Sequence, residues 1–210
     1  MAELITNYRE MIAAKQVEYD VSQTRYQGLY NRFIKRCMDL VLASVLLIFL
    51  LPLFLIISIC ILSETGFPIF YRAQRGGYHG KPFLIFKFRS MVKNADQIGG
   101  GTTAHNDSRI TNIGRFLRRT KFDEIAQLIN VIKGEMSFVG PRPELLQYTR
   151  QYNGDEKYIL EVRPGITDYS SLALINLNEI VGDEDPDTVY EQYILATKTN
   201  TASNMPPKLL

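Results

Sequence analysis

Asp123 and Glu124 are adjacent carboxylates that directly follow a basic segment, and this pattern suits phosphate chemistry. A carboxylate in the first turn of a helix is kept ionised by the helix dipole and the free N–H groups, so it can act as a nucleophile or a metal ligand. Adjacent helical side chains point about 100° apart, which allows Asp123 to attack phosphorus while Glu124 holds Mg²⁺. The simpler alternative is a helix cap followed by a solvated acid.

Cationic side chains that could bind a diphosphate lie in three places. The basic segment before the carboxylates contributes Arg115, Arg118, Arg119 and Lys121. Lys87 and Arg89 are two residues apart in a β-like run, so they share one face of the strand. Arg142 lies between two prolines, which restrict the backbone and hold it extended. A solvated strand face and a rigid connector remain the alternatives for these last two places.

A helix and a hairpin are expected to position these residues. Thr120 suits a helix N-cap with Asp123 at the third helical position, and Lys133-Gly134 suits a helix end. The expected buried face comprises Phe122, Ile125, Ala126, Ile129 and Ile132, and the opposing polar stripe comprises Asp123, Gln127 and Asn130. Two β-like runs, 69–74 and 83–91, flank a Gly-rich turn and predict a hairpin that contains Lys87.

Residues 40–62 contain no charged side chain, and about 20 apolar residues suffice to cross a bilayer as a helix. A buried core helix fits less well because the run lacks a polar stripe, and a signal peptide fits less well because a long charged segment precedes it. Pro52 near the middle predicts a kink or break. Both flanks are basic, so charge favours a helix that enters, breaks and returns to the cytoplasm over one that crosses.

Composition excludes several classes of protein. The 210 residues fit one domain, or one small domain with an attachment device. An apolar share of 46% excludes a disordered chain, and only two cysteines, Cys37 and Cys60, exclude a disulfide-stapled scaffold. The net charge of +2 combines an excess of basic residues over 64–150 with an excess of acidic residues over 151–210. The basic part favours anionic headgroups and substrates.

Three segments carry a resemblance to a known family: QRGGYHGKPFLIFKFRSM, NDSRITNIGRFLRRTKFDEIAQLINVIKGEMSFVGPRPE and VRPGIT. From about Arg32 to Thr167 the chain resembles the bacterial sugar transferases, the monotopic phosphoglycosyl transferases. The resemblance implies transfer of a sugar 1-phosphate from a UDP-sugar to a polyprenol phosphate, through a covalent phosphosugar intermediate with release of UMP. It also implies a re-entrant helix on the cytoplasmic face of the inner membrane and Mg²⁺ as cofactor, with Mn²⁺ as a substitute.

By this resemblance Asp123 is the nucleophile, and Glu124 with Asp123 forms the metal site. The implied substrate-binding cations are Lys87, Arg89, Arg118, Arg142 and Arg163. The sequence departs from the commonest family pattern after Thr167, where Asp168 and the residues that follow replace a glycine, an aromatic residue and an Asn-Gly-Arg element. This departure removes one expected phosphate-contacting arginine and leaves the sugar pocket unassigned.

The predicted fold is α+β and mostly helical: a proline-broken re-entrant membrane helix joined to a small cytoplasmic catalytic domain with a β-hairpin. The predicted boundaries are an N-terminal amphipathic helical segment (1–31), the membrane helix (32–63), the catalytic domain (64–199) and a flexible tail (200–210). The predicted partners are a UDP-sugar, a polyprenol phosphate and phospholipid, with no nucleic acid polymer; a homodimer stays open. Two alternatives are a membrane-anchored scaffold without catalysis and a one-step transferase without a covalent intermediate.

Overall fold

The computed structural model describes residues 33–98 and 107–168. The predicted N-terminal segment (1–31), the predicted tail (200–210) and the part of the predicted catalytic domain beyond Asp168 lie outside these residues. Within them the chain is a mixture of helices and short strands with one long apolar helix and a β-hairpin. The α+β class and the hairpin are therefore confirmed.

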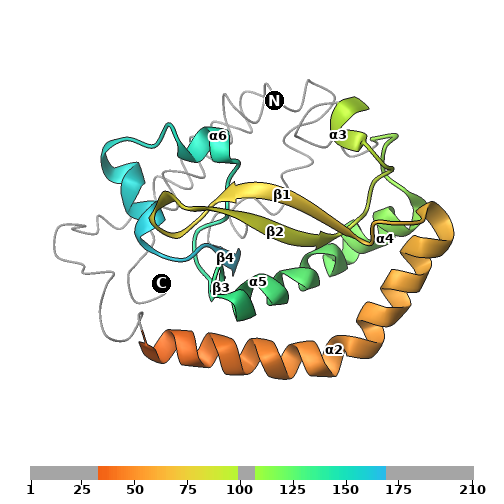
Figure 1. Cartoon of the computed structure of the whole chain (residues 1–210), viewed down its shortest axis with the longest axis horizontal. Coiled ribbons are helices and arrows are strands. Elements are labelled where there is room, and N and C mark those ends of the chain that lie inside the picture. Colours follow the sequence, from red (N-terminus) through yellow and green to blue (C-terminus); the bar gives the residue numbers. More distant parts are fainter. Residues whose placement is uncertain (1–32, 99–106, 169–210) are drawn as a thin grey trace, which may run out of the picture.

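The long apolar helix, α2, extends over Lys35–Thr65 and is, by length and composition, able to cross a membrane. It continues through Pro52 instead of ending there, and Figure 1 shows it bent between two arms. Large apolar side chains cover its outer side, each more than half exposed: Val41, Val45, Ile48, Phe49, Leu51, Leu55, Ile56 and Ile59. Helices in the core of a soluble protein bury such residues, so this surface needs an apolar environment.

Both ends of α2 contact the rest of the described chain. Near its start, the guanidinium of Arg36 donates to the carbonyl oxygens of Val131 (2.6 Å) and Ile132 (3.0 Å). These are carbonyls in the last turn of α5 (Leu128–Lys133), where a helix leaves its acceptors unpaired. At its end, the carboxylate of Glu64 accepts from the amides of residues 112 and 113, 2.8 and 2.9 Å away, in the first turn of α4 (Asn112–Thr120).

The hairpin consists of β1 (Phe70–Gly76) and β2 (Pro82–Phe88), which pair antiparallel. A short 3₁₀ turn, η3 (Tyr78–Gly80), joins them. The register sets Tyr71 directly opposite Lys87. Because opposite residues of an antiparallel pair share a face, Tyr71 and Lys87 lie beside each other on the hairpin.

The predicted single helix starting at Thr120 is wrong. Thr120 is the last residue of α4, and its hydroxyl donates back to the carbonyls of Phe116 (2.9 Å) and Leu117 (3.3 Å). Lys121 then adopts a left-handed conformation (φ 60°) that ends α4. The carboxylate pair lies on a separate 3₁₀ segment, η4 (Phe122–Gln127), which leads into α5, and the predicted helix end at Gly134 is confirmed.

Two short strands, β3 (Ser137–Val139) and β4 (Gly165–Thr167), form a parallel pair that the sequence did not predict. Gly140 and Gly165 make this possible, since a Cβ on Gly165 would come within 2.2 Å of the backbone nitrogen of Gly140. The pair sets the residues that follow each strand, including Arg142 and Asp168, at the same end of the sheet. Three short helical segments complete the described chain: α3 (Ala95–Ile98), α6 (Leu146–Thr149) and η5 (Gly154–Glu161).

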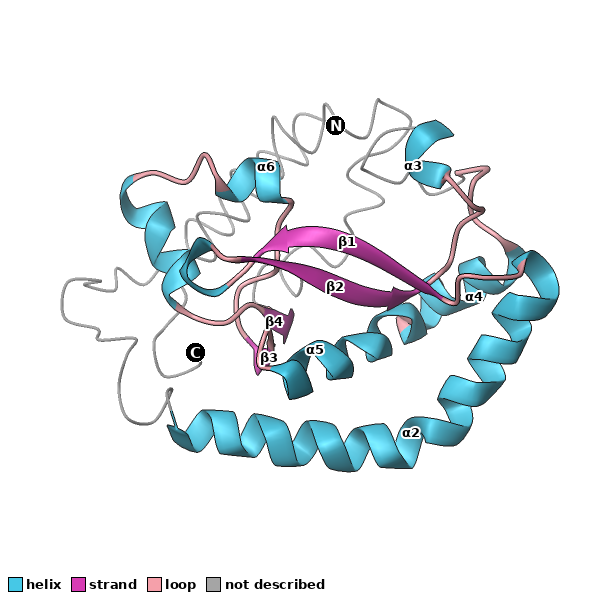
Figure 2. Cartoon of the chain, viewed as in Figure 1, coloured by secondary structure: helices cyan, strands magenta, loops and turns pink. Residues whose placement is uncertain are grey.

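The molecule has three layers, with the hairpin on one side, α4–η4–α5 in the middle and α2 on the other side (Figure 2). Two buried apolar clusters join the layers. One contains Ala43, Phe83, Ile85, Leu128, Val131 and Met136, and the other contains Ile57, Ile61, Phe88, Leu117 and Ala126. The segment that bears the carboxylates is therefore packed on both sides, which fixes its position relative to the strand of Lys87.

Candidate active site

Glu124 lies at the centre of a cluster of charges drawn from three elements. Its Oε1 accepts from Nζ of Lys87 on β2 at 2.7 Å and from a guanidinium nitrogen of Arg142, after β3, at 3.2 Å. Its side chain is only 15% exposed. Burial alone would raise the pKa of Glu124, but Lys87 and Arg142 outweigh that effect and hold its pKa at about 2. Glu124 is therefore a fixed anion between two cations.

Asp123 precedes Glu124 on η4 and is 8% exposed. Its Oδ1 is buried and has no hydrogen-bond partner among the described residues. Burial raises the pKa of Asp123, while Lys87 and Arg118 act in the opposite direction. The sequence predicted a carboxylate in the first turn of an α-helix. The structure instead places Asp123 in a short 3₁₀ segment, where burial is the largest influence on its pKa. An unpaired buried oxygen beside cations is an acceptor prepared for a partner.

Arg118 approaches the carboxylates from α4. Its Nε donates at 2.9 Å to the hydroxyl of Ser90, which lies two residues after the end of β2. The charges of Asp123 and Arg118 attract each other, and Tyr71 lies near the Arg118 guanidinium. The structure therefore brings together five of the predicted charged residues, Asp123, Glu124, Lys87, Arg118 and Arg142. Tyr71, which the sequence did not indicate, lies beside them. Only the hairpin register could have revealed Tyr71, because no pattern in the sequence distinguishes it from its neighbours.

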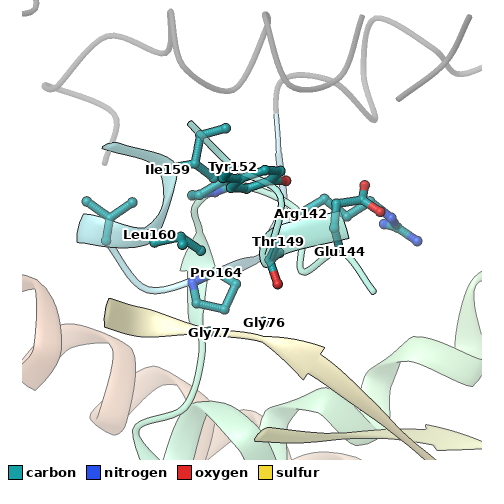
Figure 3. Close-up of a pocket in the computed structure, with 11 residues that line it drawn as sticks. Gly76, Gly77, Arg142, Glu144, Thr149, Tyr152, Ile159, Leu160 and Pro164 are labelled. Carbon is teal, nitrogen blue, oxygen red and sulfur yellow. The ribbon is translucent and has the colours of Figure 1, made fainter. Parts of the chain in front are cut away.

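Arg142 follows β3 and interacts electrostatically with Asp168 and Glu144 as well as with Glu124. Its pKa is raised because the charges of Glu124, Asp168 and Glu144 together outweigh the effect of burial. Figure 3 shows Arg142 and Glu144 beside a narrow hollow between the end of β1 and the segments α6 and η5. Thr149 fills this hollow so closely that a Cβ on Gly76 would lie 2.2 Å from its hydroxyl oxygen. Arg142 therefore lines the hollow and also pairs with Glu124 in the carboxylate site.

Arg89 and Arg163 make their described contacts elsewhere. The Arg89 guanidinium donates to the hydroxyl of Thr65 and the carbonyl of Gly66, where α2 ends. Arg163 donates to the carbonyl of Gly134 at 3.0 Å, where α5 ends, and its guanidinium lies over the ring of Tyr78. Both residues hold helix ends in this structure, and their assignment to substrate binding stays a prediction.

Asp123 and Glu124 fit a magnesium ion. Mg²⁺ prefers oxygen ligands and usually binds through one or two carboxylates plus substrate phosphates and water. The unpaired Oδ1 of Asp123 is an oxygen of this kind. The described residues contain no cluster of three or more His, Cys, Asp or Glu side chains arranged for a metal, so the remaining ligands would come from substrate and solvent. The donor set suits Mg²⁺ held jointly with a diphosphate.

A pair of carboxylates beside three cations, in a chain with an exposed apolar helix, is an arrangement typical of proteins that act on phosphorylated substrates. Residues 30–194 match the family described as bacterial sugar transferase. Since this match covers most of the chain, the chain belongs to the bacterial sugar transferase family.

Individual relatives support the same family. The chain is 41% identical over 146 residues to "UDP-glucose:undecaprenyl-phosphate glucose-1-phosphate transferase" of Escherichia coli (strain K12), covering 68% of this chain and 31% of the relative. It is 43% identical over 122 residues to "Putative undecaprenyl-phosphate N-acetylgalactosaminyl 1-phosphate transferase" of Bacillus subtilis (strain 168), covering 58% and 68%. It is 40% identical over 152 residues to "Undecaprenyl-phosphate galactose phosphotransferase" of Salmonella typhimurium (strain LT2), covering 65% and 32%. The chain thus spans about a third of the first and third of these relatives.

Proposed function

We propose that this protein transfers a sugar 1-phosphate from a UDP-sugar to a polyprenol phosphate in the inner membrane, and so initiates assembly of a glycoconjugate. The observation that carries the proposal is the unpaired, buried Oδ1 of Asp123, which lies near Lys87, Arg118 and the ion-paired Glu124. The names of the relatives, which couple nucleotide sugars or sugar phosphates to undecaprenyl phosphate, support the same reaction.

The reaction proceeds by two displacements at phosphorus. In the first, a carboxylate oxygen of Asp123 attacks the β-phosphorus of the UDP-sugar. The bond between that phosphorus and the bridging oxygen breaks, and its electron pair leaves with UMP. In the second, an oxygen of the polyprenol phosphate attacks the aspartyl-phosphosugar and restores the carboxylate. Forming a covalent intermediate divides one difficult transfer into two easier ones.

The cations around the pair supply electrostatic stabilisation. Lys87, Arg118 and Arg142 are held by protein contacts before substrate binds, so they need little reorganisation when charge develops on the phosphoryl oxygens. Mg²⁺, bound by Glu124 and Asp123 together with the diphosphate, would neutralise charge on the donor; Mn²⁺ suits the same oxygen ligands. Positioning and electrostatics supply most of the catalysis in phosphoryl transfer.

Membrane attachment follows from α2 in this proposal. Its exposed apolar residues lie in the lipid, and its two ends return to the same catalytic domain through Arg36 and Glu64. A bilayer cannot separate two ends that contact one compact domain, which supports a re-entrant helix over a crossing one. The lipid substrate carries its phosphate at the headgroup level, so a domain attached there on the cytoplasmic face meets both substrates.

Trapping of the intermediate tests the reaction. Purified protein is incubated with a panel of UDP-sugars and no lipid acceptor, and its intact mass is measured with and without Mg²⁺. We expect one donor to release UMP and to leave a phosphosugar adduct that peptide mapping assigns to Asp123. The Asp123→Asn variant should form no adduct, whereas Arg150→Gln, at an exposed site without described contacts to the cluster, should form it normally.

The two alternatives predict different results in the same experiment. Full turnover with lipid acceptor but no adduct in its absence would establish the one-step transfer. If an Asp123→Asn variant supported normal glycoconjugate assembly in cells, the protein would be a membrane-anchored scaffold without catalysis.

A further inference from the structure

Asn130 is a fully buried side chain between α5 and the open edge of the hairpin. Its Oδ1 accepts from the backbone N–H of Phe86 at 2.9 Å. Its Nδ2 donates to the carbonyl oxygen of Leu84 at 2.8 Å and to Glu135 at 2.7 Å. The carboxamide therefore uses both its acceptor and its donors, which is the expected state of a buried polar group.

The two strand contacts replace a missing neighbouring strand. Among the described residues, β2 pairs with a strand, β1, along one of its two edges. In a strand, the N–H and C=O groups of alternate residues point to the same edge, so those of residues 84 and 86 face away from β1. Asn130 bonds to the C=O of Leu84 and the N–H of Phe86 in the way that the backbone of a further strand would. A side chain on a helix thus completes part of the ladder.

These contacts join the two halves of the Lys87–Glu124 pair. Phe86 immediately precedes Lys87 on β2, and Asn130 lies six residues after Glu124 on the continuous segment η4–α5. The backbone carbonyl of Asn130 is also bonded, since it accepts from the amides of Glu135 (3.0 Å) and Met136 (3.3 Å). Asn130 is therefore held in place through both its main chain and its side chain.

We propose that Asn130 is a positioning residue that sets the strand of Lys87 in register with the segment of Glu124, an inference that rests on the proposed function of that pair. An apolar side chain of similar size would fill the same space. It would leave the Leu84 carbonyl and the Phe86 amide without partners and would let the strand edge shift. Because β1 is the one strand that pairs with β2 within residues 33–98 and 107–168, a single side chain fixes this alignment.

Hydrogen exchange in the wild-type protein tests the contact without any activity measurement. Exchange is measured at single-residue resolution in detergent micelles, with the Leu84 amide on the same strand edge as the reference. We expect the Phe86 amide to exchange at least about tenfold more slowly than that of Leu84, because it is bonded to Asn130. Equal exchange at the two amides overturns the proposal.

Three variants separate alignment from general stability. Asn130→Ala should remove the protection of Phe86 and lower kcat/KM by about 10- to 100-fold per folded molecule, as small misplacements in active sites do. Val131→Ala, at a fully buried neighbour that makes no side-chain hydrogen bond, should lower the melting temperature but keep turnover per folded molecule. Glu135→Ala, which leaves both strand contacts intact, should keep both the protection of Phe86 and the turnover.

The outcomes distinguish this inference from the proposed function. Wild-type kcat/KM in Asn130→Ala, or an equal loss in Val131→Ala, overturns the positioning role while leaving the transferase reaction in place. A wild-type protein that transfers no sugar phosphate, but protects Phe86, overturns the proposed function alone. If Asn130→Ala does not fold, the wild-type exchange decides, because equal exchange at the Phe86 and Leu84 amides overturns the proposal.

Discussion

Charge alternates across the candidate site. Glu124 faces the cations Lys87 and Arg142, and Arg142 in turn faces Asp168 and Glu144 as well as Glu124. A single buried ion pair gains little, because desolvation offsets its attraction. In a chain of alternating charges each buried group keeps a partner when another is drawn to a ligand. Arg142 can therefore contact a donor phosphate without leaving Glu124 unpaired, since Lys87 remains bonded to it.

Replacement of Arg142 tests this network. Arg142→Gln should lower kcat/KM by about 100- to 1000-fold, because it removes a preorganised donor from the site. The matched control is Arg150→Gln, which removes an exposed arginine eight residues away on the chain. UMP release is measured for both variants at saturating and limiting donor. A loss below threefold in Arg142→Gln would remove Arg142 from the catalytic cluster.

Arg89 can be assigned by kinetics. Its guanidinium contacts Thr65 and Gly66 at the end of α2, so Arg89→Met should lower the melting temperature while leaving the KM for the donor within about twofold. Lys87→Met should instead raise that KM or lower kcat. Donor-concentration series on the two variants decide between the roles. An increased donor KM in Arg89→Met, with unchanged melting, would restore Arg89 to the predicted substrate-binding set.

The site was predictable in part at this scale. Charge type and spacing in the sequence indicated Asp123, Glu124 and the cations Lys87, Arg118 and Arg142, and the structure brings these residues together. The sequence also indicated a polar stripe that includes Asn130, but it contained no sign that the stripe is buried. A helix between two layers buries both faces, so its polar residues bond to a strand edge instead of water.

At the scale of elements, the junction between α4 and η4 determines where the carboxylates point. Lys121 makes this junction by adopting a left-handed conformation, which most residues with a side chain avoid. Its position after the last helical residue is one that glycine usually takes. The chain therefore holds a strained residue two positions before Asp123.

Relief of this strain gives a prediction. Lys121→Gly should raise the free energy of unfolding by about 0.5–1 kcal/mol, because glycine adopts this conformation without a steric penalty. Arg119→Gly, two residues earlier inside α4, is the control and should lower it by about 1 kcal/mol, the usual effect of glycine in a helix. Unfolding is followed in detergent by circular dichroism. Destabilisation of similar size in both variants would contradict the left-handed conformation at Lys121.

Glu64 connects two elements that the sequence did not associate. Its carboxylate caps α4 from the last turn of α2, so Glu64→Ala should lower the stability of that junction by about 1 kcal/mol. Ser63→Ala is the matched control, because the described hydrogen bond of the Ser63 hydroxyl, to the carbonyl oxygen of Cys60, lies within α2. Hydrogen exchange at the Asn112 and Ile113 amides gives the readout. Unchanged exchange in Glu64→Ala would show that the cap contributes nothing.

Long periodic elements were predictable and short ones were not. The apolar run predicted α2, and the two β-like runs with their Gly-rich turn predicted the hairpin. The strands β3 and β4 have three residues each and lie far apart in the sequence, so no local pattern indicates their pairing. The division of the predicted helix at Lys121 was missed for a related reason, since a left-handed lysine has no signature in composition.

At the scale of the whole molecule, the polar contacts at the two ends of α2 constrain its path. At the start of α2, Arg36 donates to carbonyl oxygens of α5, and Nζ of Lys35 donates to the carbonyl oxygen of Val139 in β3 at 2.7 Å. At the end of α2, the carboxylate of Glu64 accepts from the first turn of α4. Lys35 and Arg36 belong to the basic flank that served as a topology signal in the sequence, and they thus also hold the start of α2 to the domain. A straight crossing would break one of these two sets of contacts.

Accessibility measurements test this path in full. Cys37 and Cys60 are replaced by serine, and single cysteines are introduced at Phe33, before α2, or at Lys93, after β2, both exposed. A charged maleimide that cannot cross the bilayer is applied to sealed vesicles of either orientation. We expect both positions to react only in inside-out vesicles, because both lie on the cytoplasmic side of a re-entrant helix.

Ile48→Cys, on the exposed apolar side of α2, is the control and should react in neither orientation because lipid covers it. Reaction of residues 33 and 93 from opposite sides would establish a crossing helix, and the contacts of Arg36 and Glu64 with one domain could then not both exist in the membrane.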